Sequence, residues 1–225
     1  MEKRNNLIYS KQGKMSTPDK KAFILRLFLD KDTTLVETGT HLGYTISKNS
    51  SACKEIHTAE IDENLQARAK NNCRGLGNIT FHLESSDEML MKISTGEIKT
   101  SPPYVFWLDA HLGNSELELQ QKILKRELEV IKDNFKKEDI RALLIDDSSG
   151  LTLAPDLMTV QECYDTLLEI NPNFRISSIL RGGYYSGPTP WDADVLIAYD
   201  ADFFDLMIRH RSQVLTCFDK CCVFV

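Results

Sequence analysis

The sequence lacks long apolar runs, and this absence bears on membrane association and secretion. No apolar run approaches the roughly 18 residues that a membrane-spanning helix needs. Residues 1–14, MEKRNNLIYSKQGK, are polar and basic and contain no apolar segment like that of a signal peptide. We therefore expect a protein that has no membrane partner and is not secreted by a signal peptide.

The chain also lacks the cysteine pattern of a disulfide framework or a zinc ribbon. Its cysteines, at positions 53, 73, 163, 217, 221 and 222, are too few and too scattered for such a framework in 225 residues. The segment CFDKCC at 217–222 could form half of a metal site, but no CxxC motif or matching histidine pair exists elsewhere. We interpret these residues as free thiols, which predicts a reducing compartment and a cytoplasmic protein.

An excess of positive charge is missing as well. Lysine and arginine number 27 against 33 aspartates and glutamates, which gives a net charge of −6 and a pI near 5.4. This balance argues against a nucleic-acid backbone as the main partner. Length and composition favour one α/β domain over residues 1–225. Within it we expect an N-terminal helix or lid at 1–30, a core at 31–200 and a C-terminal extension at 201–225.

Strand and helix patterns alternate along the chain until its last part. Residues 174–180 and 194–199 read as strands joined by RGGYYSGPTPWDA, which leaves no room for a helix, so this pair must be an antiparallel hairpin. The pattern predicts an α/β fold, a Rossmann-like doubly wound sheet of seven strands that is mostly parallel and ends in that hairpin. The five earlier strands are expected at 34–37, 55–60, 79–83, 104–108 and 142–145.

The segment VETGTHLGYT, residues 36–45, has the strand, glycine loop and helix context of a nucleotide-like site. Its glycines, Gly39 and Gly43, follow a GxxxG spacing, whereas a dinucleotide fingerprint needs GxGxxG. His41 stands where the middle glycine would let the backbone approach a pyrophosphate. The loop therefore favours a ligand without a diphosphate.

A second segment, HTAEIDENLQ at 57–66, places an acid at the end of the next strand. Glu60 lies where an acidic side chain can bind ribose hydroxyls, although acids also occur in the first turn of helices. Asp62 suits that helix-capping role. Glu60 is therefore the better candidate for the ribose.

These segments, with FWLDAH at 106–111 and LLIDDS at 143–148, resemble class I S-adenosylmethionine-dependent methyltransferases. Within that class, the LD and DD strand ends resemble the metal-dependent O-methyltransferases of the catechol O-methyltransferase type. The chain is also similar to uncharacterised methyltransferase-like proteins with ETGT, WLD(A/G)H and IDD segments. The resemblance covers about residues 30–200 and implies strand order 3-2-1-4-5-7-6 and S-adenosylmethionine as cofactor. The implied cofactor contacts are Glu37, Gly39, Thr40, His41, Gly43, Glu60, Ile61, Ser86, Asp87 and Asp109, with Ser86 and Asp87 beside the adenine. We expect Ser86 also to cap the helix that starts there.

Three acidic residues end adjacent strands and suggest a metal site. Asp109 and the pair Asp146–Asp147 would converge at one sheet edge, where like charges repel unless a cation joins them. Oxygen-only ligands favour a hard divalent cation, here Mg²⁺ or Mn²⁺. The alternative is that Asp146 and Asp147 only cap the following loop and helix.

The catalytic base of the resembling family is absent, because Leu112 stands where those enzymes carry a lysine. His111 is the substitute, since its ordinary pKa suits removal of a hydroxyl proton. It could instead hydrogen-bond the loop or ligate the metal, which would leave Asp109 or water as the base. The missing lysine argues against a catechol acceptor.

The acceptor is expected to be a small molecule or glycan, most simply a hydroxyl of a sugar or other polyol. The loop at 181–192 supplies aromatic and basic side chains for it, although these could also pack as an ordinary hairpin. SPPY at 101–104 is like a tetrapeptide of amino-methyltransferases but precedes its strand. A non-catalytic cofactor-binding module and a nucleic-acid methyltransferase remain the alternatives, and the oligomeric state stays undetermined. The candidate acceptor residues are Arg181, Tyr184, Tyr185 and Trp191.

Overall fold

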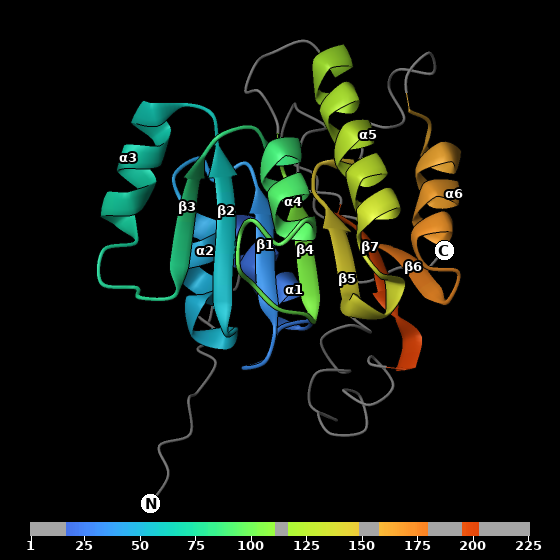
Figure 1. The fold of residues 1–225 in the computed structure, drawn as a ribbon, viewed down its shortest axis with the longest axis horizontal. Coiled ribbons are helices and arrows are strands. Elements are labelled where there is room, and N and C mark those ends of the chain that lie inside the picture. Colours follow the sequence, from blue (N-terminus) through green and yellow to red (C-terminus); the bar gives the residue numbers. More distant parts are fainter. Residues whose placement is uncertain (1–16, 111–116, 149–157, 180–194, 203–225) are drawn as a thin grey trace, which may run out of the picture.

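The computed structural model describes residues 17–110, 117–148, 158–179 and 195–202. Within them seven strands form one sheet in the order β3-β2-β1-β4-β5-β7-β6 (Figure 1). The first five strands pair in parallel, whereas β7 runs antiparallel to both β5 and β6. The expected fold class and strand order are thus confirmed. The strands are β1 (Thr34–Thr38), β2 (Glu55–Glu60), β3 (Ile79–Leu83), β4 (Tyr104–Leu108), β5 (Ile140–Ile145), β6 (Phe174–Ile179) and β7 (Val195–Asp200).

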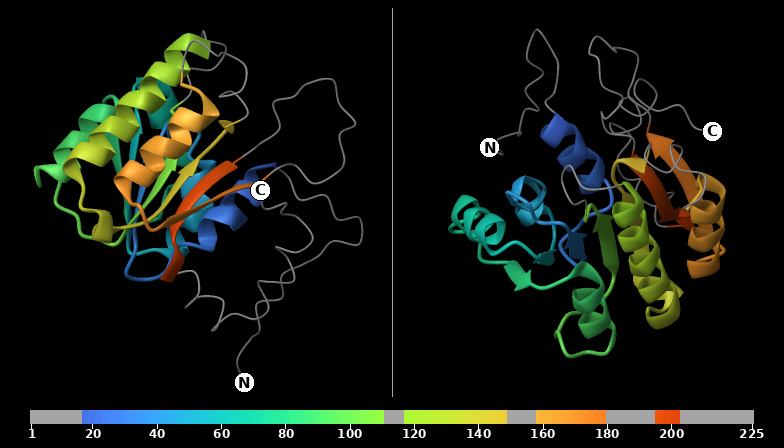
Figure 2. Two further views of the ribbon diagram at one scale, coloured as in Figure 1. Left: turned by 90° about the vertical axis from the view of Figure 1, so that its right-hand side faces the viewer. Right: turned by 90° about the horizontal axis from the view of Figure 1, so that it is seen from above.

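Helices cover both faces of the sheet, which makes a three-layer arrangement (Figure 2). Helices α1, α2 and α3 lie on one face, and α4, α5 and α6 lie on the other. Residues 50–52 and 137–139 form short 3₁₀ turns before β2 and β5. The helices are α1 (Thr17–Arg26), α2 (Tyr44–Asn49), α3 (Glu63–Asn72), α4 (Ser86–Ser94), α5 (Leu117–Asn134) and α6 (Val160–Ile170).

Two apolar cores lie on the two faces because successive side chains of a strand point in opposite directions. Phe106 packs in the core under α4, α5 and α6, whereas its neighbour Trp107 packs in the core under α1 and α2. Both side chains are fully buried. All five residues of β4 are buried, as expected for a central strand covered on both faces.

Local capping explains where three helices begin. Gly43 adopts a left-handed φ of 73° just before α2, so this helix starts at Tyr44. Asp62 caps α3, as expected, by accepting hydrogen bonds from the backbone N–H groups of Asn64 and Leu65 at 2.8 and 3.1 Å. The N-cap of α4 is Ser85 and not Ser86, which is the first residue of that helix.

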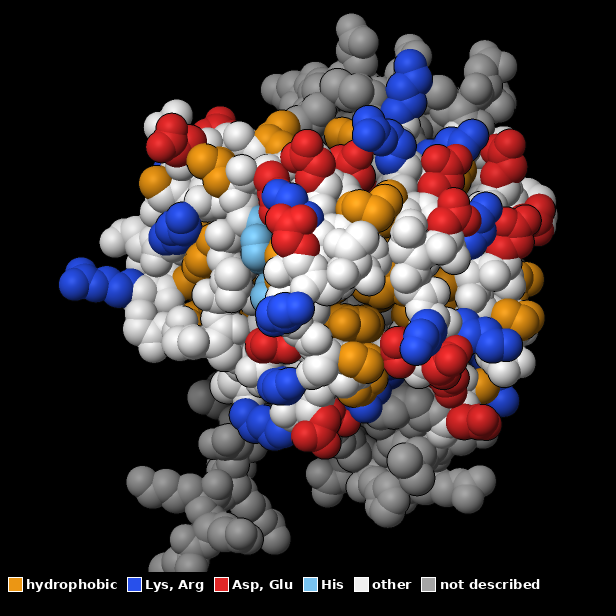
Figure 3. Space-filling model, in the orientation of Figure 1, with side chains coloured by type: hydrophobic (Ala, Val, Ile, Leu, Met, Phe, Trp, Pro, Cys, Tyr) orange, Lys and Arg blue, Asp and Glu red, His pale blue; other side chains and the backbone are white. Residues whose placement is uncertain are grey.

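The outer face formed by α4, α5 and α6 mixes both signs of charge. Lysine, arginine, aspartate and glutamate side chains alternate over these helices (Figure 3). This face therefore has no extended field of one sign.

No helix among the described residues combines the length and apolar character needed to cross a bilayer.

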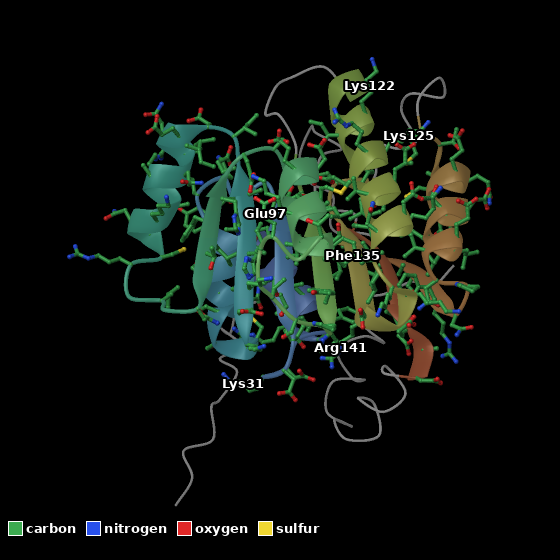
Figure 4. The ribbon with its side chains drawn as sticks, in the orientation of Figure 1. Lys31, Glu97, Lys122, Lys125, Phe135 and Arg141 are labelled. Atoms are coloured by element: carbon green, nitrogen blue, oxygen red, sulfur yellow. The ribbon has the colours of Figure 1, made fainter. Side chains whose placement is uncertain are left out.

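The amino edge of the sheet is closed by polar contacts far from the strand ends that carry the acids. The Thr34 hydroxyl donates to the carbonyl of Ser101 at 2.6 Å, which places the SPPY turn at this edge. Arg141 donates to Asp30 at 2.7 Å and to Thr33 at 2.6 Å, near the lower end of β5 (Figure 4). Of the expected lid and C-terminal extension, residues 1–16 and 203–225 lie outside the described residues.

Candidate active site

Strand register brings the acidic strand ends together at the carboxyl edge. Thr38 at the end of β1 pairs with Ala59 of β2 and with Leu108 of β4, and Leu108 in turn pairs with Ile145 of β5. The residues that follow these strands therefore lie side by side, as parallel strands require. The site consists of three parts, formed by β1 and β2, by β3, α4 and α5, and by β4 and β5.

Glu37 is the innermost acid of the β1–β2 part of the site. It is 2% exposed and accepts a hydrogen bond from the Thr58 hydroxyl at 2.6 Å. Burial raises the pKa of Glu37 to about 8; the Thr58 hydrogen bond opposes this rise and the charge of Glu60 adds to it. An ammonium group arriving beside this carboxyl would favour its ionised form.

The β1–α2 loop uses its backbone N–H groups to hold the end of β2. Gly39 and Thr40 both donate to the carbonyl of Ala59, at 3.1 and 3.0 Å. His41, which has a positive φ of 48°, donates to Glu60 Oε2 at 2.8 Å. These donors are therefore engaged within the chain and do not form a phosphate-binding concavity.

Close contacts within the chain leave little room for a side chain at either loop glycine. Gly39 has a φ of 79°, and a Cβ built there would lie 2.1 Å from the carbonyl oxygen of Asp109. A Cβ at Gly43 would lie 3.0 Å from the sulfur of Cys73, the residue that follows α3. Backbone conformation and packing therefore account for a glycine at both positions, and their contacts with a cofactor stay a prediction.

Glu60 ends β2 with both carboxylate oxygens engaged. Oε1 accepts from the backbone of Asp62 at 3.0 Å, and Oε2 accepts from His41 as described. The next residue, Ile61, is 57% exposed, and Leu83, which ends β3 beside Glu60, is 51% exposed. Two apolar side chains thus flank the acid. Sequence reasoning missed Leu83, although its place at the end of the neighbouring strand was a usable signal.

Ser86 belongs to a buried polar cluster that sequence reasoning did not find. Its side chain hydrogen-bonds Glu127 of α5, which also hydrogen-bonds Thr38. Glu127 is 1% exposed, and its Oε1 has no hydrogen-bond partner among the described residues. Burial raises the pKa of Glu127 to about 7; the two hydrogen bonds oppose this rise and Asp87 adds to it. The only sequence signal for this cluster was the position of Glu127 next to Leu128, on the apolar stripe of α5.

Asp87 lies beside this cluster but points to a different partner. Its carboxylate forms an ion pair with Arg126 of α5, and its side chain is 20% exposed. The α4 and α5 helices are therefore joined by two contacts at the carboxyl edge, one buried through Glu127 and one partly exposed through Arg126.

The acidic triad comprises Asp109, Asp146 and Asp147, as the sequence suggested. One oxygen from each of the three carboxylates lies within 4.8 Å of the others. The indole N–H of Trp107 donates to Asp109 Oδ2 at 3.3 Å, and the Asp147 backbone donates to Asp146 Oδ1 at 2.9 Å. Burial raises the pKa of Asp109 well above its ordinary value, and the charge of Asp146 adds to this rise.

Lys21 of α1 reaches this triad from 125 residues away in the sequence, and sequence reasoning missed it. Its ammonium forms an ion pair with Asp146 Oδ2 and lies 3.9 Å from Asp147 Oδ1. Burial lowers the pKa of Lys21, but the nearby carboxylates outweigh this, so the net pKa is raised. An ammonium group of the same chain therefore lies beside the carboxylates of the triad.

Several expected site residues fall where the structure gives no description. His111, the expected base, follows β4 and lies outside the described residues. The same holds for the acceptor candidates Arg181, Tyr184, Tyr185 and Trp191. Their roles remain predictions from the sequence.

Comparison with known proteins identifies the fold. No protein-family model matches the chain, and no curated protein matches its sequence. An rRNA methylase from Streptococcus thermophilus is 10% identical, with a TM-score of 0.54 over 83% of this chain and 97% of that one. A putative methyltransferase from Streptococcus mutans in complex with SAH (S-adenosylhomocysteine) is 14% identical, with a TM-score of 0.54 over 83% and 98%. A putative O-methyltransferase from Klebsiella pneumoniae is 16% identical, with a TM-score of 0.51 over 88% and 84%. The chain thus has the seven-stranded fold found in class I S-adenosylmethionine-dependent methyltransferases.

Proposed function

We propose that this protein is an S-adenosylmethionine-dependent methyltransferase that acts on a hydroxyl oxygen of a sugar or other small polyol. One observation carries the proposal. In a methyltransferase fold, two strand-end acids suited to the cofactor lie at the same edge as three carboxylates suited to a cation. The acids are Glu37 and Glu60, and the carboxylates are Asp109, Asp146 and Asp147.

The β1–β2 part and the β3–α4–α5 part of this edge would hold different portions of the cofactor. Glu60 keeps free lone pairs on oxygens that already accept one backbone hydrogen bond each, so it can also accept from ribose hydroxyls. Glu37 is a buried acid that the cationic methionine part would hold in its ionised form. Exposed Ile61 and Leu83 supply an apolar surface for a purine ring. Ser86 lies at the start of α4, near where that ring would end.

The triad fits a hard divalent cation, because its donors are oxygens alone. Asp109, Asp146 and Asp147 would hold Mg²⁺ or Mn²⁺, which supplies Lewis-acid charge that lowers the pKa of a bound hydroxyl. The chain itself positions the carboxylates: Trp107 orients Asp109, and the Asp147 backbone orients Asp146. His111 is the proposed proton acceptor, with Asp109 or water as the substitute.

Cofactor binding is tested by calorimetry with S-adenosylhomocysteine. Glu60→Ala is expected to weaken binding by about 1–3 kcal/mol, because a charge-assisted pair of hydrogen bonds is lost. Glu63→Ala removes an exposed acid in the first turn of α3 and is the matched control, with unchanged affinity expected. Tight binding of NAD without binding of S-adenosylhomocysteine would refute the proposed cofactor.

Methyl transfer is tested with labelled S-adenosylmethionine and a panel of sugars and polyols. Activity should disappear in EDTA, return with Mg²⁺ or Mn²⁺, and be lost in Asp146→Ala. His111→Ala should lower turnover by about 10²–10⁴-fold while affecting acceptor affinity less. Full activity of Asp146→Ala in EDTA would leave the carboxylates with a structural role only. Cofactor binding without transfer to any acceptor would favour a non-catalytic module.

Nucleic acid is the second candidate acceptor, and one feature of the carboxyl edge favours it. Lys122 and Lys125 are exposed near the start of α5, at the edge toward which the parallel strands run (Figure 4). Such side chains can contact phosphates, although the chain as a whole carries a charge of −6. Transfer of label to RNA, with a steep dependence on salt that Lys122→Gln and Lys125→Gln reduce, would establish this alternative over a polyol.

A further inference from the structure

Lys21 lies where a cation would meet the acidic triad, and the packing of α1 places it there. Its side chain is 19% exposed, and its ammonium contacts the fully buried carboxylate of Asp146. Leu25, one helical turn further along α1, is fully buried in the core beneath this helix. Because residues four apart share one helix face, the burial of Leu25 turns Lys21 toward the sheet.

The contact engages the oxygen of Asp146 that accepts no backbone hydrogen bond and is therefore the more available of the two to a metal ion. Oδ1 of Asp146 accepts a hydrogen bond from the Asp147 backbone at 2.9 Å, whereas Oδ2 pairs with Lys21. An ammonium group and a divalent cation on the same Oδ2 would repel each other at short range in a site with little water. The two cations are therefore alternative partners of this oxygen.

The triad needs a positive charge whether or not a metal is present. Up to three negative charges lie within 4.8 Å of one another, and Lys21 is also close enough to Asp109 and Asp147 to interact with both. A lysine side chain is a compact charge on a flexible four-carbon stem, so it can move away from the carboxylates while α1 stays packed.

We propose that Lys21 is an internal competitor of the divalent cation at the acidic triad, and that metal binds only when this lysine leaves Asp146 Oδ2. The inference rests on the proposed function, since it takes the triad as the metal site. Lys21 stabilises the metal-free protein by partly neutralising the carboxylates. It also weakens metal binding, because each bound metal must displace an existing ion pair.

The test measures Mn²⁺ binding to the full chain, without cofactor or acceptor, from the electron paramagnetic resonance signal of the free ion. Lys21→Met removes the ammonium and keeps an unbranched side chain, and it should tighten Mn²⁺ binding about tenfold or more. Lys21→Arg keeps the charge and should bind Mn²⁺ as weakly as the unchanged protein. Lys31→Met is the matched control, because it removes one exposed positive charge at the opposite edge (Figure 4), and its Mn²⁺ affinity should not change.

A second measurement and a second variant keep the test decisive if Lys21→Met does not fold. Thermal unfolding should show that Mn²⁺ raises the midpoint more for Lys21→Met than for the unchanged protein, and Lys21→Gln serves if the methionine variant does not fold. Adding Asp146→Asn to either variant should abolish the gain in affinity. Equal Mn²⁺ affinities with and without Lys21, equal tightening by Lys31→Met, or no Mn²⁺ binding to the Lys21 variants would each overturn the proposal. A protein that binds Mn²⁺ as expected but transfers no methyl group refutes the proposed function and leaves this inference intact.

Discussion

Glu127→Gln is expected to remove one component of the pH dependence of stability. The Glu127 carboxyl is 1% exposed, and burial raises its pKa from an ordinary 4.5 to about 7. The folded protein therefore favours the neutral carboxyl. Because the folded-state pKa lies above the unfolded value, this contribution is fully present below about pH 4.5 and is lost as the pH rises through about 7.

The size of the effect follows from the gap between these two values. At about 1.4 kcal/mol for each pH unit, a change from 4.5 to about 7 corresponds to roughly 3 kcal/mol of unfolding free energy. Glutamine is neutral throughout, and it keeps an oxygen that can accept from Thr38 and Ser86. The variant should therefore gain stability relative to the unchanged protein as the pH rises, whatever fixed cost the amide introduces.

Urea unfolding followed by circular dichroism, between about pH 5 and pH 8, measures this difference. Subtracting the two stability curves removes the titration of other groups, Glu37 among them. Glu129→Gln, which changes an exposed acid two residues further along α5, is the control and should leave the pH dependence unaltered. A difference between the unchanged protein and Glu127→Gln that stays constant with pH would refute the reasoning about the buried carboxyl.

Two further predictions concern the loops that support the site. Gly39→Ala should destabilise the protein by about 3 kcal/mol or more, because its Cβ would meet the Asp109 carbonyl at a positive φ. Gly96→Ala, with a φ of 75° and no atom within 4 Å, should cost only about 1–2 kcal/mol, and equal costs in thermal unfolding would contradict the contact argument. Asp62→Ala should lower the free energy of unfolding by about 1 kcal/mol, because the α3 cap is lost. Asp62→Asn should keep most of the stability that the cap provides. Unchanged unfolding midpoints in both variants would argue against the cap.

Local pattern was enough to place most of the sheet. The strands at Glu55–Glu60, Ile79–Leu83 and Tyr104–Leu108 lie where the sequence predicts them. Their signals are alternation, apolar content and flanking turn residues, all of which act within a few positions of the chain. The short connection after β6 likewise required an antiparallel neighbour, since a parallel one needs a long crossover. The strand order came from the resemblance to methyltransferases and is confirmed by the pairing.

The candidate site was only partly accessible to the same reasoning. Asp109, Asp146 and Asp147 could be brought together from the sequence because parallel strands share a carboxyl edge. The close contact that requires glycine at position 39 could not be predicted from the sequence, because the Asp109 carbonyl that excludes a side chain follows a different strand. Ser86 was expected to cap α4, whereas the cap is Ser85 and the Ser86 side chain hydrogen-bonds Glu127. That contact depends on how α4 packs against α5, which the local cap motif does not show.

What the sequence by itself determined is therefore the set of elements, the hairpin and the acids at the strand ends. Only the tertiary structure decided which cation these acids meet. Lys21 is separated from Asp146 by 125 residues, and its direction depends on how α1 packs through Leu25 against the sheet. Glu127 likewise becomes a buried acid only when α5 lies against Ser86 and Thr38. Contacts of this kind depend on the packing of helices onto the sheet, which short-range patterns along the chain do not encode.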